Sequence, residues 1–370
     1  MNFDTLSVHG GNGYEYEGAV SVPIFQTSTY IGGNEYSYSR CSNPTRDSAE
    51  KALALLEQGK HGFAFCSGLA AVSAVFSLLK CGDRVIVSDD LYGGTYRLIE
   101  EIFKNFGIDF AYADMTEPDC AEEVLDGAKM LFTETPTNPM MKIADIKRLA
   151  DICKKTGTLL AVDNTFLTPY FQNPLSLGAD IVVHSATKFL SGHHDTLSGA
   201  VMTNDDDIAK RISCIQRTLG NMLSPFDCWL LLRGIKTFPM RMERHEKNAF
   251  AVAELLESHP RVERVIYPGL PTHGGHSLCA RQARGFGGVV SFYLKDADGA
   301  KRMLQGGRVV KFAESLGGPQ TLVTYPVTQT HASMPESVRS KIGITDRLIR
   351  LSAGLEAAED IIADLEAILR

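Results

Sequence analysis

The stretch Val182-Val183-His184-Ser185-Ala186-Thr187-Lys188-Phe189 completes a short apolar run, and Ala161-Val162-Asp163-Asn164-Thr165 completes another shortly before it. Continuous apolar runs of this length are typical of strands buried on both faces of a parallel sheet. The carboxyl ends of such strands lie along one edge, where α/β sheets bind ligands. The sequence therefore predicts that Lys188 and Asp163 lie at one site on the edge of a parallel sheet.

These two positions carry complementary chemistry. Lys188 stands beside the hydroxyls of Ser185 and Thr187. An amine for a Schiff base, donors for a phosphate and a carboxylate for a pyridinium nitrogen are what pyridoxal 5'-phosphate (PLP) requires. The apolar flanks also predict a partly dry environment, which lowers the pKa of an ammonium group. A solvated surface lysine is the alternative, but the combination favours PLP as the cofactor and an amino acid as the substrate.

The pattern between about residues 60 and 205 alternates between strand-like and helix-like segments. Such alternation predicts an open α/β sheet covered by helices. The expected strands are 63–65, 84–87, 110–112, 130–132, 159–162 and 181–183, and the expected helices are 67–80, 96–106 and 146–153.

The two ends of the chain differ from this middle part. Residues 1–45 are rich in Gly, Tyr, Ser and Asn and predict an extended arm over the domain or onto a partner subunit. Residues 46–225 form the α/β domain of this prediction, and residues 226–370 form a smaller α+β domain. In that last part we expect helices at 227–237, 240–258 and 356–369 and strands at 289–293 and 321–323.

Composition limits the possible partners. The 370 residues carry a net charge of −7 and contain no Lys/Arg-rich block, so nucleic acid and anionic membranes are not expected partners. No apolar run approaches the roughly 18 residues of a membrane-spanning helix. The N-terminal residues do not resemble a secretion signal, so we expect a cytoplasmic protein.

The eight cysteines and the paired histidines predict no metal site. No two cysteines form a C-x-x-C pair, so we expect reduced thiols rather than disulfides or a zinc site. His193-His194-Asp195 and His273-Gly274-Gly275-His276 lack the spacing and partners of metal ligands.

Three further segments follow expected strands. Ser67-Gly68-Leu69 begins a helix, where free amides bind anions, although Ser67 is equally suited to a simple helix cap. Tyr92 is suited to stacking on an aromatic cofactor or to a turn before two glycines. Asn138, in the Pro-containing loop 134–139, could bind a ligand or belong to a turn.

Together these residues resemble the Cys/Met-metabolism (transsulfuration) family of PLP-dependent enzymes, which includes cystathionine β-lyase, γ-lyase and γ-synthase and methionine γ-lyase. The resemblance extends from 38–46 to 349–356, and its most specific segment is 183–188 followed by Ser191-Gly192-His193. It implies an α/β type I PLP-dependent transferase fold (aspartate aminotransferase-like), with a large, mostly parallel sheet domain and a smaller α+β C-terminal domain.

The resemblance also implies a role for each matching position. Lys188 would bind the cofactor covalently and transfer protons, and Asp163 would pair with the pyridinium nitrogen. Tyr92 would stack on the ring and assist proton transfer. The implied phosphate ligands are Gly68, Leu69, Ser185 and Thr187, with Tyr38 and Arg40 supplied by the neighbouring subunit.

The implied substrate site lies beside the cofactor. Arg350 would bind the substrate α-carboxylate with the help of Asn138 and Ser315, and Glu314 would hold the distal ammonium of cystathionine. Because Tyr38 and Arg40 would reach a neighbouring site, one complete site needs two chains. The resemblance further implies a homotetramer built from two such catalytic dimers.

Some positions depart from the family pattern and bear on specificity. Gly94 stands where methionine γ-lyases usually carry Cys, which argues against that activity. Ser37 stands where γ-lyases and γ-synthases often carry an acidic residue, and His194 where Ser, Gly or Asn is usual. The long insertions of O-acetylhomoserine sulfhydrylases are absent.

Three hypotheses follow. The first is a PLP-dependent C–S lyase of sulfur amino acids that cleaves cystathionine by β- or γ-elimination. The second is a cystathionine γ-synthase, which would replace the acyl group of an O-acylhomoserine with cysteine, and methionine γ-lyase is less favoured. The third is a non-catalytic binding protein, against which the intact Lys188, Asp163 and Arg350 argue.

Overall fold

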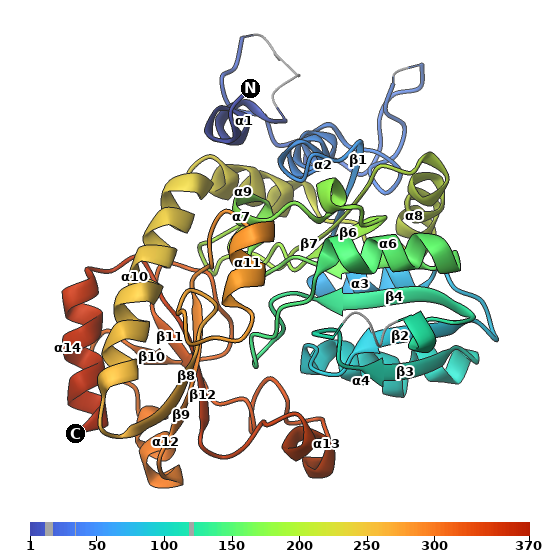
Figure 1. Cartoon of the computed structure of the whole chain (residues 1–370). Helices are drawn as coiled ribbons and strands as arrows, with labels where there is room; N and C mark the ends of the chain where they lie inside the picture. The colour runs from blue at the N-terminus through green and yellow to red at the C-terminus, as the bar shows by residue number, and fades with distance from the viewer. Residues whose placement is uncertain (12–17, 34, 118–121) are drawn as a thin grey trace.

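The computed structural model of the chain describes residues 1–11, 18–33, 35–117 and 122–370. In these ranges the strands form two sheets that lie side by side, and helices cover the outer faces of both (Figure 1). No helix within these ranges is long and apolar enough to span a membrane.

The first sheet is the mostly parallel sheet that the sequence predicts. Its strands follow the order β1-β7-β6-β5-β4-β2-β3. From β3 to β6 all neighbours are parallel, and β7 is antiparallel to both β6 and β1. The strands are β1 (His61–Phe65), β2 (Arg84–Ser88), β3 (Asp109–Ala113), β4 (Ala128–Glu134), β5 (Leu159–Asp163), β6 (Ile181–His184) and β7 (Gly199–Thr203).

Helices pack around this sheet. They are α2 (Pro44–Leu56), α3 (Gly68–Phe76), α4 (Gly93–Glu101), η1 (Phe103–Phe106), α6 (Ile146–Thr156), α7 (Thr168–Phe171), η2 (Pro174–Leu177) and α8 (Asp206–Leu219). Helix α3 ends before the predicted residue 80, because Leu78 and Leu79 donate to carbonyls only three residues back. Helix α4 begins before the predicted residue 96, because the amides of Thr95 and Tyr96 both donate to Tyr92 O.

The second sheet has five strands in the order β10-β11-β12-β9-β8. The strands are β8 (Val262–Ile266), β9 (Val289–Leu294), β10 (Lys311–Phe312), β11 (Leu322–Thr324) and β12 (Leu348–Ser352). The accompanying helices are α9 (Pro225–Ile235), α10 (Phe238–Ser258), α11 (His276–Gln282), α12 (Ala297–Met303), α13 (Glu336–Lys341) and α14 (Ala358–Leu369). The central strand β12 was not predicted as a strand, because Arg350 interrupts its apolar pattern.

The N-terminal segment contains one element that the sequence did not predict. Helix α1 (Phe3–His9) packs against the chain's own α2 and α10, and Phe3 makes ring contacts with Tyr170 and Phe238. The segment therefore begins as a packed helix rather than as an extended arm. The domain boundaries at residues 45 and 225 stay predictions.

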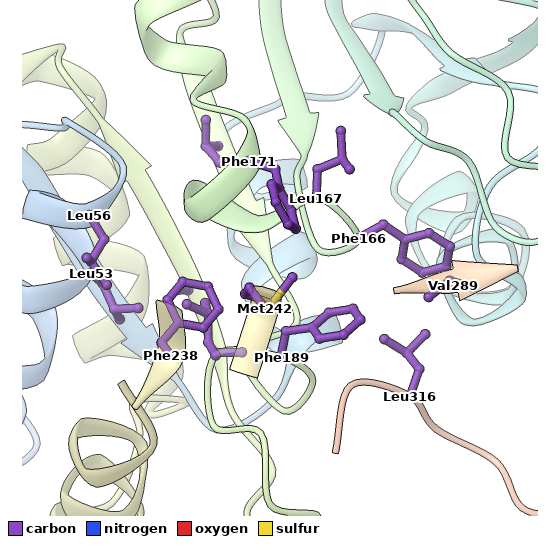
Figure 2. Close-up of a cluster of buried hydrophobic side chains, with 14 of the residues drawn as sticks. Leu53, Leu56, Phe166, Leu167, Phe171, Phe189, Phe238, Met242, Val289 and Leu316 are labelled. Carbon is purple, nitrogen blue, oxygen red and sulfur yellow. The ribbon is translucent and has the colours of Figure 1, made fainter. Parts of the chain in front are cut away.

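A buried apolar cluster joins the two halves next to Lys188 (Figure 2). Phe189 is fully buried between Met242 of α10, Val289 of β9 and Leu316, which follows Ser315. The residues immediately after Lys188 and Ser315 are thus anchored in one core. This packing fixes the backbone on both sides of the cavity described below.

Candidate active site

One cavity of about 340 Å³ opens where the carboxyl edge of the first sheet meets the second sheet. The residues predicted for the cofactor and substrate sites converge on it from widely separated parts of the chain. Those that line it are Gly68, Leu69, Tyr92, Asn138, Asp163, Ser185, Thr187, Lys188, Glu314, Ser315 and Arg350.

Tyr38 and Arg40 do not line this cavity. The Tyr38 side chain is 45% exposed. Arg40 donates to Arg217 O at 2.7 Å, and its guanidinium lies 5.6 Å from the centroid of the Tyr38 ring. Their predicted role in a neighbouring subunit's site stays a prediction.

Lys188 lies at the centre of the cavity wall. Its Nζ donates a hydrogen bond of 3.1 Å to Ser315 Oγ. Burial lowers the pKa of Lys188 to about 8, and the positive charge of Arg350 acts in the same direction, while Glu314 opposes them. A pKa near 8 leaves on the order of a tenth of the amine neutral and nucleophilic at pH 7, far more than for an ordinary lysine.

Asp163 ends β5 and is held by the residue two positions later. The Thr165 amide donates to Asp163 Oδ1 at 2.9 Å, and the Ser185 amide donates to Thr165 Oγ1 at 2.9 Å. Burial raises the pKa of Asp163, and Thr165 and His184 act in the opposite direction. A cation in the cavity would stabilise the ionised carboxylate, as a pyridinium requires.

The start of α3 forms a cradle for an anion. Ser67 Oγ accepts from the Ala70 amide at 3.1 Å, so the predicted helix cap is present, and Gly68 is the first helical residue. A Cβ atom on Gly68 would lie 2.7 Å from Ser185 Cβ. Only glycine therefore lets the N-terminus of α3 approach Ser185 this closely, which is the arrangement that a phosphate-binding turn needs.

Arg350 is placed on β12 for a carboxylate. Its side chain is 2% exposed, and it donates to Asn138 Oδ1 at 2.9 Å and to Ser315 O and Thr324 Oγ1 at 3.1 Å each. Its buried Nε has no hydrogen-bond partner among the described residues. Burial lowers the pKa of Arg350 to about 10, so it remains charged at neutral pH. A buried charged guanidinium with a spare N–H is suited to bind an anion.

Tyr92, the residue immediately before α4, also lines the cavity. Burial raises the pKa of its phenol, and Glu314 acts in the same direction, so the phenol is protonated at neutral pH. A Cβ atom on Gly94 would approach Tyr92 Cε1 to 2.3 Å. The small residue at position 94 therefore leaves the room that the Tyr92 ring occupies.

Several lining residues were not predicted as site residues, among them Glu134, Thr165, Phe166, Leu197 and Thr330. Glu134 and Thr165 follow the strand ends from which the other residues were identified, so that same signal could have found them. Leu197 and Thr330 follow no such strand end and reach the cavity only through the tertiary fold.

The donor set fits PLP on the observations above. The glycine cradle at Gly68 offers an anion site, Lys188 offers a partly neutral amine, and Asp163 offers a carboxylate at the strand end for the ring nitrogen. Across the described ranges no group of three or more His, Cys, Asp or Glu side chains could hold a metal ion, and the seven cysteines described there are free. Cys120 lies outside the described residues.

Comparisons with known proteins agree with this geometry. A family model described as "Cys/Met metabolism PLP-dependent enzyme" matches residues 4–370. Cystathionine gamma-lyase of Dictyostelium discoideum is 46% identical over 374 residues, which cover 99% of this chain and 97% of that protein. Cystathionine beta-lyase of Lactococcus lactis subsp. cremoris is also 46% identical, over 372 residues that cover 99% and 98%.

Solved structures show the same overall arrangement. Cystathionine gamma-lyase from Lactobacillus plantarum complexed with L-serine has a TM-score of 0.97 and 42% identity, with 100% of this chain and 98% of that chain covered. Cystathionine gamma synthase from Xanthomonas oryzae pv. oryzae in complex with cystathionine has a TM-score of 0.96 and 40% identity, with the same coverage. The comparisons confirm the family, the fold class and the cofactor predicted from the sequence.

Proposed function

The chain belongs to the family of Cys/Met metabolism PLP-dependent enzymes, and we propose that it is a carbon–sulfur lyase that cleaves cystathionine by β- or γ-elimination. One observation carries this proposal: Ser315 accepts a hydrogen bond from Lys188 through its Oγ and from Arg350 through its carbonyl oxygen. The amine that would move protons and the guanidinium that would bind a carboxylate are therefore held at adjacent points of one wall. Such a pair suits an α-amino acid, whose carboxylate and Cα proton are carried by adjacent carbons.

The first sheet supplies the cofactor ligands of this proposal. Lys188 would hold the PLP aldehyde carbon, and Asp163 would hold the ring nitrogen. The phosphate would be bound by Gly68 and Leu69 at the start of α3 and by the hydroxyls of Ser185 and Thr187, which follow β6. Tyr92 would lie over the ring. When bound, PLP withdraws electrons from the substrate Cα and so makes its proton acidic.

The chain's own side chains would carry out the remaining work. Arg350 would bind the substrate α-carboxylate, assisted by Asn138. Once the substrate amine replaces Lys188 on the cofactor, the freed, neutral Lys188 amine would take the proton from Cα. It would then return a proton to the departing sulfur. Ser315 would orient Lys188 for both transfers, and the Tyr92 phenol would assist as a proton donor.

The distal end of the substrate would reach Glu314. This carboxylate lines the cavity and faces Lys188, Tyr92 and Arg350. A carboxylate there is suited to the second ammonium group of cystathionine. The same side chains serve elimination from Cβ and from Cγ, and the relatives at 46% identity include both β- and γ-lyases.

A second candidate is cystathionine γ-synthase, because a synthase structure with cystathionine bound shares 40% identity and a TM-score of 0.96 with this chain. The same site would then accept an O-acylhomoserine and use cysteine as the incoming thiol. Methionine γ-lyase is less favoured, since Gly94 stands where those enzymes usually carry Cys. A cytoplasmic location stays a prediction of the sequence.

The proposal includes a shared site between subunits. Tyr38 and Arg40 do not line the cavity of their own chain. Tyr38 is 45% exposed, and the Arg40 guanidinium lies over the Tyr38 ring. We infer that they reach the phosphate site of a second copy, in a homotetramer of two catalytic dimers. Leu219, next to Gly220 beside Arg40, is 58% exposed, and Leu197, which lines the cavity, is 67% exposed; both suit burial in such an assembly.

The test is to incubate the purified, PLP-loaded protein with cystathionine and to identify the products by mass. Homocysteine with pyruvate and ammonia means β-elimination, and cysteine with 2-oxobutyrate and ammonia means γ-elimination. Formation of cystathionine from cysteine and an O-acylhomoserine, without cleavage, assigns the synthase instead. Lys188→Ala is the control, and absence of all three reactions in the loaded wild type would contradict catalysis.

A further inference from the structure

Glu134 is a buried carboxyl in the cavity wall that the proposed mechanism does not use. It is the last residue of β4 and pairs in register with Asp163 at the end of the parallel strand β5. Both residues line the cavity. Paired residues of neighbouring strands project to the same face of a sheet, so the two carboxyl groups lie side by side.

The Glu134 carboxyl also holds the segment that carries Tyr92. The Tyr92 amide donates to Glu134 Oε1 at 2.8 Å, and the Asn138 amide also stabilises this carboxyl. Tyr92 and Asn138 are themselves cavity residues, and Asn138 bonds Arg350. Glu134 therefore connects the backbone of Tyr92 with the loop of Asn138, which bonds Arg350.

The charged side chains that act most strongly on Glu134 are also carboxylates. Asp163 on β5 and Asp90, which follows β2, both act to raise the pKa of Glu134, and burial raises it further. The two backbone amides act in the opposite direction, and no cationic side chain is among its main influences. Asp163 differs, because the Thr165 amide bonds it and lowers its pKa, and His184 acts in the same direction. One proton shared between the two carboxyl groups is thus better placed on Glu134.

We propose that Glu134 is a protonated carboxylic acid in the cofactor site, which leaves the negative charge that faces the cofactor nitrogen on Asp163 and fixes the backbone of Tyr92. In this account Oε1 accepts from the Tyr92 amide as a neutral carboxyl oxygen. Glu134 is a positioning residue in this account. The inference rests on the proposed role of Asp163 and requires nothing about the sulfur substrate.

The proposal has a direct spectroscopic test. PLP-loaded protein is prepared with 13C-labelled glutamate side-chain carboxyls, and infrared spectra are recorded at neutral pH for the wild type and for Glu134→Gln. We expect the carbonyl stretch of a neutral carboxylic acid in the wild type and its loss in the variant. Burial also raises the pKa of Glu50 to about 7, so Glu50 contributes a band of its own. The difference between the wild-type and variant spectra separates the Glu134 band from it. Glu314→Gln is the matched control, since Glu314 lines the same cavity but is exposed.

A second measurement separates charge from shape. Glutamine reproduces a neutral carboxyl, so Glu134→Gln should keep the PLP dissociation constant within about threefold, whereas Asp163→Asn should weaken it at least about tenfold. If Glu134→Gln does not fold, Glu134→Asp removes the label while it keeps an acid, and the labelled band should again disappear.

Two results would overturn the proposal: no difference band between wild type and variant at neutral pH, or a loss of PLP affinity in Glu134→Gln as large as in Asp163→Asn. Unchanged affinity in Asp163→Asn would instead contradict the proposed role of Asp163. The infrared result on Glu134 would then stand by itself, so the two failures are distinguishable.

Discussion

Lys188 and Ser315 lie 127 positions apart in the chain, yet Lys188 Nζ donates to Ser315 Oγ at 3.1 Å across the junction of the two sheets. Ser315 has a backbone φ of +102°, which is unfavourable for a residue with a side chain. The surrounding structure overcomes this cost, because Arg350 binds the Ser315 carbonyl and Leu316 is buried in the core. Ser315 therefore bonds both Lys188 from the first half of the molecule and Arg350 from the second.

Lys188→Ala should lower the turnover of the preferred substrate by on the order of a thousandfold or more, because the proton-transfer group is removed. Borohydride reduction should fix PLP covalently in the wild type but not in the variant. Peptide mapping by mass spectrometry checks this directly. Cofactor attached to any other lysine would contradict the assignment.

The rate of PLP capture by cofactor-free protein should depend on pH through Lys188. Only the neutral amine attacks an aldehyde, and burial lowers the pKa of Lys188 from 10.5 to about 8. The capture rate should therefore rise with pH and level off above a midpoint near 8, as followed by absorbance.

Two variants test the cause of that midpoint. Arg350→Gln removes a positive charge that lowers the pKa of Lys188, so the midpoint should move up. Glu314→Gln removes a negative charge that raises it, so the midpoint should move down. No shift in either variant would show that burial alone controls the amine, and shifts of the same sign would contradict the assigned roles of both charges.

Arg350→Lys should raise KM for the amino-acid substrate by about ten- to a hundredfold, because a lysine cannot replace the charge-assisted guanidinium bonds. PLP content should remain at the wild-type level. Steady-state kinetics at saturating PLP provide the measurement. Thr324→Val, which removes only a neutral acceptor of Arg350, is the control and should change KM by no more than about fivefold.

Arg40→Ala should weaken PLP retention, although Arg40 lies outside its own chain's cavity. Co-expression with Lys188→Ala tests the shared site. A mixed dimer would contain one site with an intact Lys188 and an intact Arg40, so random pairing should restore about a quarter of wild-type activity. No recovery in isolated mixed dimers, or full PLP retention by Arg40→Ala, would show that Arg40 does not act across subunits.

Gly68→Ala should weaken PLP binding by about ten- to a hundredfold, because the new methyl group would overlap Ser185. Equilibrium titration of cofactor-free protein with PLP measures the effect. Gly274→Ala is a suitable control, since a Cβ atom there would meet nothing within 4 Å. Equal effects of both substitutions would contradict a cradle at Gly68.

Six of the seven strands described in the first sheet (all but β7, Gly199–Thr203, which was missed) were predicted, because its central strands are buried on both faces and appear as apolar runs. Strand β12 was missed for the opposite reason: a buried arginine, satisfied by Asn138 and Thr324, interrupts it. Helix α1 is stabilised by distant aromatic contacts, with Tyr170 and Phe238, that local sequence does not reveal.

The same distinction applies to the site. Asp163 and Lys188 could be placed because each follows a predicted strand. Thr330 reaches the cavity because its backbone packs on Gly93, where a Cβ atom would lie 2.0 Å from Thr330 O. That contact depends on how the second half folds back onto α4. The hydrophobic periodicity of the sequence does not predict the contact between Thr330 and Gly93.

The two sheets contribute differently to the cavity. Gly68, Asp163 and Lys188 belong to the first sheet and its connections, while Ser315 and Arg350 belong to the second. Apart from Ser315 and Arg350, which act on Lys188, substitutions in the second sheet can therefore change how a substrate is held while they leave the cofactor's surroundings intact. Such modularity gives evolution a simple route by which one scaffold diversifies among β-lyases, γ-lyases and γ-synthases without rebuilding its shared catalytic chemistry.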